Sequence, residues 1–215
     1  MDLSDSARTG PRFRRRKNMC TTEPIRDKRE MRKLINYFEE TGQTRNCAMV
    51  TLGFATALRI TDELTLTWGD VYDFGSERFR THFEIRERKT GKPKQVKISR
   101  YVKDILGKLL KEIRRQGKSV SAGDHIFSNG RTKENHISRV QAWRIIKKAV
   151  KALAIRGNIA CHSLRKTFGY YAWKYLKKSA AVIMDIYNHS SFAVTKRYLG
   201  ITQDDLDELY DEMIL

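Results

Sequence analysis

The chain has 215 residues, 40% of them hydrophobic and 32% charged, so it is long enough to bury one sizeable core. Its 43 lysines and arginines exceed its 25 acidic residues by 18, and such an excess indicates a polyanionic partner, with DNA or RNA first. No apolar run approaches the roughly 18 residues of a membrane-spanning helix, no signal-peptide pattern is present, and the three cysteines lack metal or disulfide spacing. We therefore expect a cytoplasmic protein, associated with nucleic acid and not with a membrane.

The two ends of the chain carry opposite charge. Residues 8–33 contain eleven basic side chains against three acidic ones, whereas residues 202–215 contain six carboxylates and no basic residue. We predict a disordered basic arm over residues 1–22, the main domain over 23–202, and an acidic helix over 203–215. An apolar stripe follows this last helix at three- and four-residue steps, at Leu206, Leu209, Tyr210 and Met213.

The first half of the domain shows helical periodicity that is interrupted once. A helix is expected from about Glu23 to Glu40, because proline suits a first helical turn. Residues 46–59 are apolar on nearly all sides, which predicts a buried helix that ends at Arg59. Residues 61–68 continue as a short helix that ends at Gly69.

A change to two-residue periodicity predicts a β-hairpin. Residues 80–88 and 94–99 alternate apolar and charged side chains, and the “KTGKP” turn lies between them. Helical periodicity then returns, so the fold class is mainly α with one small antiparallel sheet (α+β). Further helices are expected over residues 100–116, 138–154, 163–177, 179–187, 191–198 and 203–214.

Six side chains in five short stretches carry chemistry that the fold does not require. They are Arg59 in “ALRITDELTLTW”, Lys89 in “RKTGKP”, His162 and Arg165 in “ACHSLRKTF”, His189 in “NHSS”, and Tyr198 in “KRYLG”. Each alone has an ordinary structural explanation, such as a helix cap, a solvated turn or a core side chain. Together they form a cationic set without an acidic base or a metal-ligand cluster, and a phosphodiester is its natural ligand.

Phosphoryl transfer needs a nucleophile in line, stabilised charge on the phosphate oxygens and a proton for the leaving oxygen. Arginine forks match two phosphate oxygens, and lysine or histidine can donate the proton. Tyrosine can be the nucleophile if nearby cations stabilise its phenolate. This set therefore requires neither a metal nor a cofactor.

In this order the stretches resemble the catalytic domain of the tyrosine recombinase (phage integrase) family, over roughly residues 25–200. The family pattern has an arginine in a segment like “LRISELLALRW”, a lysine in a “KTGK”-like turn, H-x-x-R, a histidine in “LGHSS”, and a tyrosine nine residues later. Asp62 replaces a usual glutamate and can still orient Arg59. Tyr187 and Asn188 replace Leu-Gly, and asparagine tolerates the left-handed backbone of such a turn.

The resemblance implies a site-specific DNA recombinase or integrase of a phage or other mobile element, which forms a 3′-phosphotyrosyl intermediate and a free 5′-hydroxyl. It implies no cofactor, and it implies self-association on double-stranded DNA as a tetrameric synapse, with the C-terminal segment docked on a neighbouring protomer. In the implied roles Tyr198 attacks, Arg59 and Arg165 hold the phosphate, His162 exchanges a proton with Tyr198, His189 bonds a phosphate oxygen, and Lys89 protonates the leaving oxygen.

Family members commonly carry a separate core-binding domain before the catalytic one, and here only the arm and the first helix precede it. Either the arm or an accessory DNA-binding protein takes its place, or the chain is a minimal recombinase. Three alternatives stay open: a type IB topoisomerase-like relaxing enzyme, a non-catalytic DNA-binding accessory protein of the same fold, and a general DNA- or RNA-binding module. A missing catalytic residue would favour the accessory protein, and none is missing.

Overall fold

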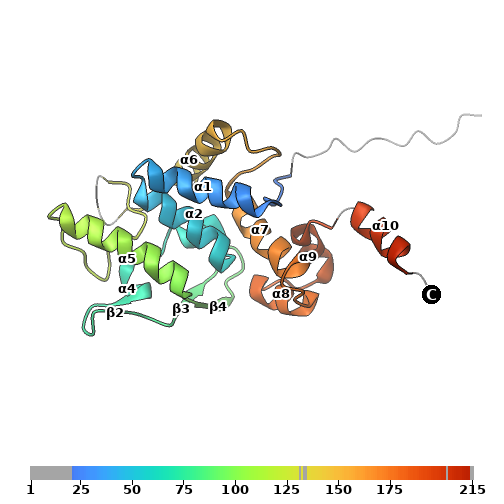
Figure 1. The fold of residues 1–215 in the computed structure, drawn as a ribbon. Helices are drawn as coiled ribbons and strands as arrows, with labels where there is room; N and C mark the ends of the chain where they lie inside the picture. The colour runs from blue at the N-terminus through green and yellow to red at the C-terminus, as the bar shows by residue number, and fades with distance from the viewer. Residues whose placement is uncertain (1–20, 131, 133–134, 202, 214–215) are drawn as a thin grey trace, which may run out of the picture.

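The computed structural model describes residues 21–130, 132, 135–201 and 203–213 (Figure 1). The basic arm predicted over residues 1–22 lies outside these residues except for its last two. Among the described residues no helix is both long and apolar enough to cross a membrane. The helices are α1 (Lys28–Glu40), α2 (Thr44–Thr56), α3 (Ile60–Glu63), α4 (Trp68–Val71), α5 (Arg100–Arg115), α6 (Arg139–Ala152), α7 (Cys161–Lys174), α8 (Ala180–Tyr187), α9 (Phe192–Leu199) and α10 (Gln203–Glu212).

The fold is mainly helical, as predicted, but the described residues contain two small antiparallel sheets and not one. The predicted hairpin is β3 (His82–Arg86) paired with β4 (Pro93–Lys97), in the register Ile85↔Lys94. The second sheet pairs β1 (Tyr72–Asp73) with β2 (Arg78–Phe79). Two-residue strands are too short to show an alternating pattern, so the sequence gives no periodic signal for them.

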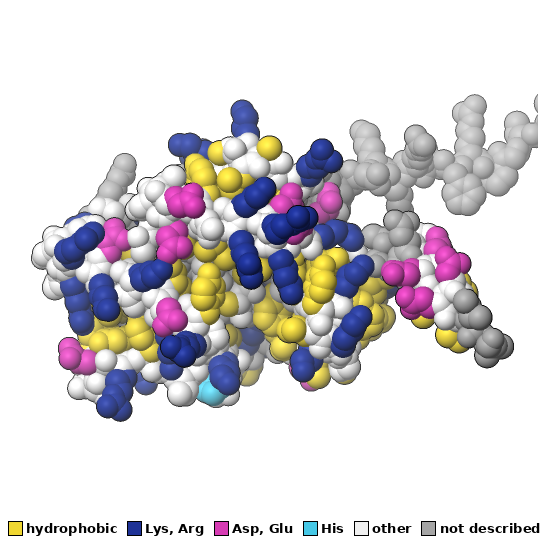
Figure 2. Space-filling view, in the orientation of Figure 1, with side chains coloured by type: hydrophobic (Ala, Val, Ile, Leu, Met, Phe, Trp, Pro, Cys, Tyr) yellow, Lys and Arg dark blue, Asp and Glu magenta, His cyan; other side chains and the backbone are white. Residues whose placement is uncertain are grey.

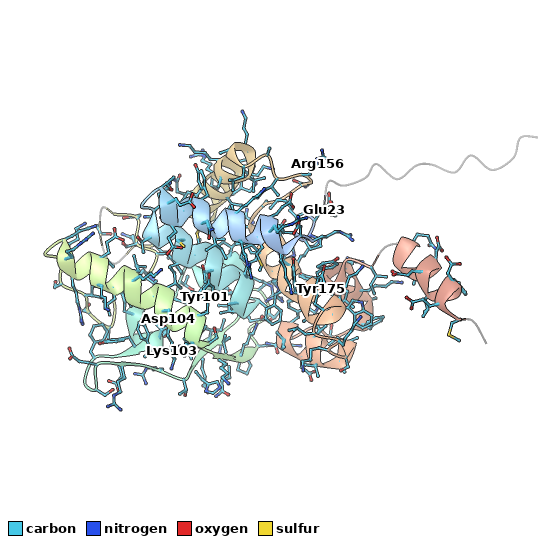
Figure 3. The ribbon with its side chains drawn as sticks, viewed as in Figure 1. Glu23, Tyr101, Lys103, Asp104, Arg156 and Tyr175 are labelled. Atoms are coloured by element: carbon cyan, nitrogen blue, oxygen red, sulfur yellow. The ribbon has the colours of Figure 1, made fainter. Side chains whose placement is uncertain are left out.

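The first helix begins at Lys28 and not near Glu23. The Asp27 side chain caps it by accepting the Arg29 backbone N–H at 2.7 Å. The residues before it have no regular secondary structure and contact neighbouring segments. Figure 3 shows Glu23 near the segment that carries Arg156, and the Glu23 backbone N–H donates to the Asn158 carbonyl at 3.1 Å. The Ile25 backbone N–H donates to Thr167 Oγ1 at 2.8 Å. These contacts with α7 compete successfully with an earlier helix start.

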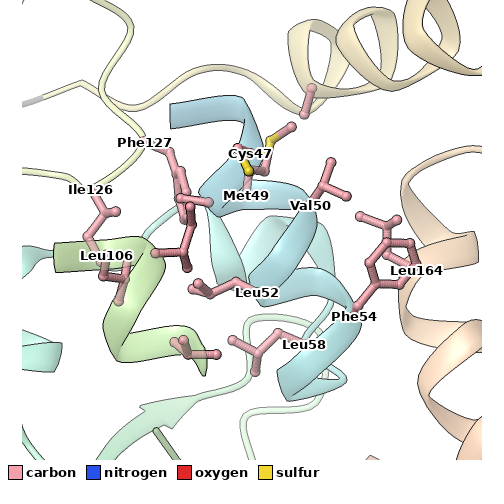
Figure 4. Close-up of a cluster of buried hydrophobic side chains, with 14 of the residues drawn as sticks. Cys47, Met49, Val50, Leu52, Phe54, Leu58, Leu106, Ile126, Phe127 and Leu164 are labelled. Atoms are coloured by element: carbon pink, nitrogen blue, oxygen red, sulfur yellow. The ribbon is translucent and has the colours of Figure 1, made fainter. Parts of the chain in front are cut away.

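Helix α2 packs against α1, α5 and α7. Figure 4 shows its buried side chains beside Leu106 of α5 and Leu164 of α7. Most of its apolar side chains are buried, as the sequence predicts, and Met49 and Leu52 are fully buried. The helix ends at Thr56, because Ala57 adopts a left-handed conformation with φ of 55°. Arg59 therefore lies in the turn before α3 and not within the helix, and Gly69 lies inside α4 and does not end a helix.

A carboxyl group is buried next to this core. Glu63 on α3 is 1% exposed, and its Oε1 has no hydrogen-bond partner among the described residues. Burial holds the pKa of Glu63 well above its usual range, because the charged form loses its water. The folded protein therefore retains a proton on Glu63 at a pH at which the unfolded chain releases it.

A Glu63→Gln variant is expected to be more stable than the wild-type protein at pH 7. The wild-type free energy of unfolding falls as pH rises above about 4.3, where an unfolded glutamate ionises, and a glutamine lacks this loss. The gain should be larger at pH 7 than at pH 4, because the unfolded wild-type chain releases the Glu63 proton between these two pH values. Urea unfolding at pH 7 and pH 4 measures it, and an equal difference at both pH values would contradict the assignment to ionisation.

Candidate active site

A cavity of about 1300 Å³ brings the predicted site residues together. It lies between the α2–α3 turn, the β3–β4 turn, the starts of α6 and α7, and the segment from α8 to α9. Arg165 does not line the cavity but lies directly behind its wall, 1% exposed, with its guanidinium carbon 5.6 Å from the centre of the Tyr198 ring. The predicted residues that line the cavity are Arg59, Lys89, His162, His189 and Tyr198.

Arg165 connects the ends of two helices. Its guanidinium donates to the Ala57 carbonyl, just after α2, and to the Tyr187 carbonyl, at the end of α8, the latter at 3.1 Å. Its guanidinium carbon also lies 4.5 Å from the centre of the Tyr187 ring. The Nε–H has no hydrogen-bond partner among the described residues. A buried donor without a partner is costly, so this N–H is an unsatisfied donor directly behind the cavity wall.

Arg59 is oriented mainly by a carboxylate that the sequence did not reveal. Its Nη1 lies 2.7 Å from Glu87 Oε1 and 3.9 Å from Asp62 Oδ2. Asp62, the predicted partner, instead accepts the backbone N–H of Arg88 at 3.1 Å. Burial opposes the charge of Glu87, but Arg59 and a hydrogen bond from Thr90 outweigh it and hold the pKa of Glu87 below its usual range. Both carboxylates thus fix the β3–β4 turn to the Arg59 segment.

Tyr198 on α9 lies between two histidines. Its ring centre is 5.1 Å from that of His162 and 4.8 Å from that of His189. His189 Nδ1 is 3.0 Å from Thr195 Oγ1, which orients the imidazole. Burial, followed by the charge of Arg165, lowers the pKa of each histidine to about 4. Both are therefore neutral near pH 7, and each has a nitrogen that can accept a proton.

Two lysines of the hairpin have different environments. Lys89 lies on the exposed turn and lines the cavity. Lys94 is buried on β4, and burial followed by the charge of Arg165 lowers its pKa to about 8. Lys94 Nζ donates to the Thr56 carbonyl at 3.4 Å, next to the Ala57 carbonyl that binds Arg165. Two cations therefore hold the negative end of α2, where the chain turns towards the cavity.

The replacement of Leu-Gly by Tyr187 and Asn188 preserves the turn before His189. Asn188 ends α8 in a left-handed conformation, with φ of 53° and ψ of 33°. Tyr187 is fully buried, and its hydroxyl donates to the Arg165 carbonyl at 2.6 Å. Its ring also stacks on His189, with 5.0 Å between the ring centres. The bulkier pair therefore adds contacts to Arg165 and His189.

Solved structures define the class of fold. The crystal structure of XerA recombinase matches with a TM-score of 0.68 and 23% identity, covering 89% of this chain and 66% of that one. The XerH site-specific recombinase, in a post-cleavage complex with palindromic difH substrate, matches with a TM-score of 0.70 and 15% identity, covering 88% and 53%. The fold is that of a tyrosine recombinase catalytic domain.

The sequence comparisons identify the family. The sequence model of the phage integrase family matches residues 26–204. The probable integrase/recombinase YoeC of Bacillus subtilis (strain 168) is 33% identical over 186 residues, which cover 86% of this chain and 93% of that protein. Tyrosine recombinase XerD of Halalkalibacterium halodurans is 25% identical over 77% of this chain and 52% of its own length, so the chain spans about half of that relative. The chain belongs to the phage integrase family of tyrosine recombinases.

Proposed function

We propose that this protein is a site-specific DNA recombinase or integrase that cuts and rejoins DNA through a 3′-phosphotyrosyl intermediate. The position of Tyr198 carries the proposal. Its ring touches both cavity histidines and lies beside the guanidinium of Arg165, so a phenol, two neutral bases and a buried cation meet at one point. Transfer of a phosphodiester to a tyrosine requires these three kinds of group: a nucleophile, a proton acceptor and a cation near the phosphate.

Two arginines bind the phosphate in this proposal. The free Nε–H of Arg165 and the guanidinium of Arg59 supply donors and positive charge to the non-bridging oxygens. Glu87 holds Arg59 from behind, and two backbone carbonyls hold Arg165. Because these donors are fixed before DNA arrives, little reorganisation is needed when charge builds up on the phosphate.

The protons move through three side chains. Neutral His162 takes the phenolic proton as Tyr198 Oη forms its bond to phosphorus, and the bond from phosphorus to the 5′-oxygen breaks. Lys89 gives a proton to that oxygen and leaves a free 5′-hydroxyl. His189 donates to a non-bridging oxygen. The phosphotyrosine conserves the energy of the phosphodiester, so a second 5′-hydroxyl rejoins the strand by the reverse steps.

Positive charge around the cavity supports double-stranded DNA as the partner. Arg88, Lys92 and Arg139 line the cavity beside the proposed catalytic groups. On the face of the domain shown in Figure 2, lysine and arginine side chains are spread among acidic ones, and further acidic side chains gather on α10. Thr22 lies on the cavity rim, where its carbonyl accepts Lys166 Nζ at 2.6 Å. The basic residues that precede Thr22 in the sequence therefore connect to the domain beside the proposed DNA-binding site. With DNA as its substrate, the protein would act at the nucleoid.

Trapping on a nicked suicide DNA substrate tests this function. The short 5′-hydroxyl fragment diffuses away after cleavage, so the protein should remain on the DNA as an SDS-resistant adduct. A label on the DNA 5′ of the cleaved phosphate should stay with the protein, and peptide mapping should place it on Tyr198. Exchange between two marked duplexes, with no relaxation of plasmids lacking the site, would distinguish recombination from topoisomerase activity. Failure to form an adduct on a substrate that is bound specifically would contradict the proposal.

We also propose that α10 docks on a second copy of the chain when a tetramer assembles on DNA. Figure 1 shows α10 at the end of the domain that carries α7, α8 and α9. Its apolar stripe is not covered by its own domain, since Leu209 is 57% and Tyr210 81% exposed. A groove of about 320 Å³ offers an acceptor, lined by apolar side chains of α1, α2 and α7 and by Lys28. Tyr175 in this groove also contacts Lys28, so its rim is positive and suits an acidic helix.

Deletion of residues 203–215 should weaken assembly on DNA while the monomer stays folded. A Leu209→Ala/Tyr210→Ala double variant should have the same effect, because it removes apolar contact area from the docked helix. A single Asp211→Ala variant should weaken assembly less, because one exposed charge contributes less than the apolar contact area. Analytical ultracentrifugation on a DNA site measures the effect, and an unchanged distribution of oligomers after the deletion would rule out this role.

A further inference from the structure

Two side-chain contacts connect the β3–β4 hairpin to the loop after α8, beside the cavity. Asn188 Nδ2 donates to the Pro93 carbonyl at 3.1 Å, from the end of α8 to the start of β4. In the opposite direction, Lys92 Nζ lies 3.4 Å from the Asn188 carbonyl. Asn188 and Pro93 are 95 positions apart, so this contact joins parts of the chain that are distant in the sequence.

The hairpin leaves the Pro93 carbonyl free for this contact. The Glu87 backbone N–H donates to the Lys92 carbonyl, and Arg86 faces Pro93 as the next pair. Hydrogen-bonded and non-hydrogen-bonded pairs alternate along an antiparallel ladder, so the carbonyl of Pro93 points away from β3. Asn188 therefore binds an acceptor that the ladder itself does not use.

The identity of residue 188 makes the contact possible. The position has a left-handed backbone, which glycine adopts without cost and asparagine adopts more readily than other residues with side chains. The family segment “LGHSS” has glycine here, which permits the conformation but has no amide. In this chain the same backbone carries a donor directed at the hairpin.

The two connected loops carry groups that must act together. The hairpin turn bears Lys89, and Glu87 of the same turn holds Arg59. The loop after α8 bears His189, whose ring contacts Tyr198. Lys89 itself lies on an exposed turn, so the Asn188 contact restrains the segment that must present it to the leaving oxygen.

We propose that Asn188 is a positioning residue, which clamps the Lys89 turn to the His189 loop through its amide and keeps Lys89 at the leaving oxygen. The inference rests on the proposed function, because it assigns the clamp to the leaving-group step of that reaction. The Asn188 amide restrains the hairpin in a way that a glycine at this position cannot, because glycine has no side-chain donor.

Hydrogen exchange of the Asn188→Gly variant tests the clamp without any reaction. Glycine keeps the left-handed backbone and removes only the amide, so the melting temperature should change little. Amide exchange in the hairpin turn should become roughly three- to tenfold faster, the expected loss for one hydrogen bond. The backbone N–H groups to follow are those of Glu87, Arg88 and Gly91, which the turn protects. A Glu77→Gly variant, at another left-handed and exposed position, is the matched control and should not change this exchange.

Cleavage kinetics then assign the clamp to the leaving-group step. On an ordinary suicide substrate, Asn188→Gly should form the adduct roughly three- to tenfold more slowly. On a substrate with a bridging 5′-sulfur the defect should disappear, because a thiolate leaves without a proton. Lys89→Ala should show the same rescue with a larger defect. A merely structural role would slow both substrates equally.

The outcomes separate the inference from the function. Unchanged exchange in the hairpin of Asn188→Gly would overturn the clamp, whatever the wild-type protein does to DNA. Faster exchange with an equal defect on both substrates would overturn its assignment to Lys89. Absence of an adduct with the wild-type protein on its bound site would instead overturn the proposed function, while the exchange result would still decide whether the clamp exists.

Discussion

A Tyr198→Phe variant is expected to bind DNA as tightly as the wild-type protein and to form no covalent adduct. Phenylalanine retains the ring that packs against His162, His189 and the guanidinium of Arg165. The cavity should therefore keep its shape and charge, and electrostatic binding of DNA depends on that charge. The nucleophilic oxygen is gone, so the covalent step has no substitute. Gel-shift affinity and SDS-resistant adduct, measured on one suicide substrate, report the two properties.

A Tyr37→Phe variant is the matched control for this loss. Tyr37 is a half-buried tyrosine on α1 and lines neither the cavity nor the proposed acceptor groove for α10. It should form the adduct at the wild-type rate. A general nucleic-acid-binding module would show no difference between the two variants, and a residual adduct in Tyr198→Phe would place the nucleophile elsewhere. A large loss of DNA affinity in Tyr198→Phe would mean that the hydroxyl contributes to binding.

The sequence led to the residues of this cavity because each lies in a short stretch with recognisable spacing. His162 and Arg165 are three residues apart, and His189 and Tyr198 nine, so local patterns carry them. Glu87 and Lys94 were missed because their partners are distant in the sequence. The pairs Arg59–Glu87 and Lys94–Thr56 form only when the hairpin folds onto the end of α2. In retrospect, an acidic residue in a basic turn was the available signal for Glu87.

The errors in the predicted helix boundaries also come from contacts between residues that are distant in the sequence. Proline at position 24 suggested an early helix start, but residues 22–26 contact α7 without forming a helix, and Asp27 provides the cap. The apolar pattern of α2 continues to Leu58, but the helix ends before Ala57, whose carbonyl accepts a hydrogen bond from Arg165. A single apolar pattern cannot show that a distant arginine ends a helix. The buried arginine thus determines both the site and the local fold.

An Arg165→Lys variant should therefore lose both chemistry and stability. Lysine keeps the charge but has one ammonium group in place of a planar fork, so it cannot serve the Ala57 carbonyl, the Tyr187 carbonyl and a phosphate together. Buried carbonyls that lose their donors should cost about 2–4 kcal/mol in the free energy of unfolding. Adduct formation should fall by at least about 100-fold, as for loss of a fixed donor to a transition-state oxygen. Urea unfolding and single-turnover cleavage measure the two effects.

A Tyr187→Phe variant separates these two losses. It removes the hydroxyl that donates to the Arg165 carbonyl but leaves the guanidinium and its ring contact in place. It should lose about 1 kcal/mol of stability and retain adduct formation within a few-fold of wild type at a temperature where both are folded. If Tyr187→Phe lost cleavage as completely as Arg165→Lys, the packing around α8 and not the guanidinium would control the chemistry. If Arg165→Lys cleaved at the wild-type rate while folded, Arg165 would be a structural residue, and Arg59 alone would have to hold the phosphate.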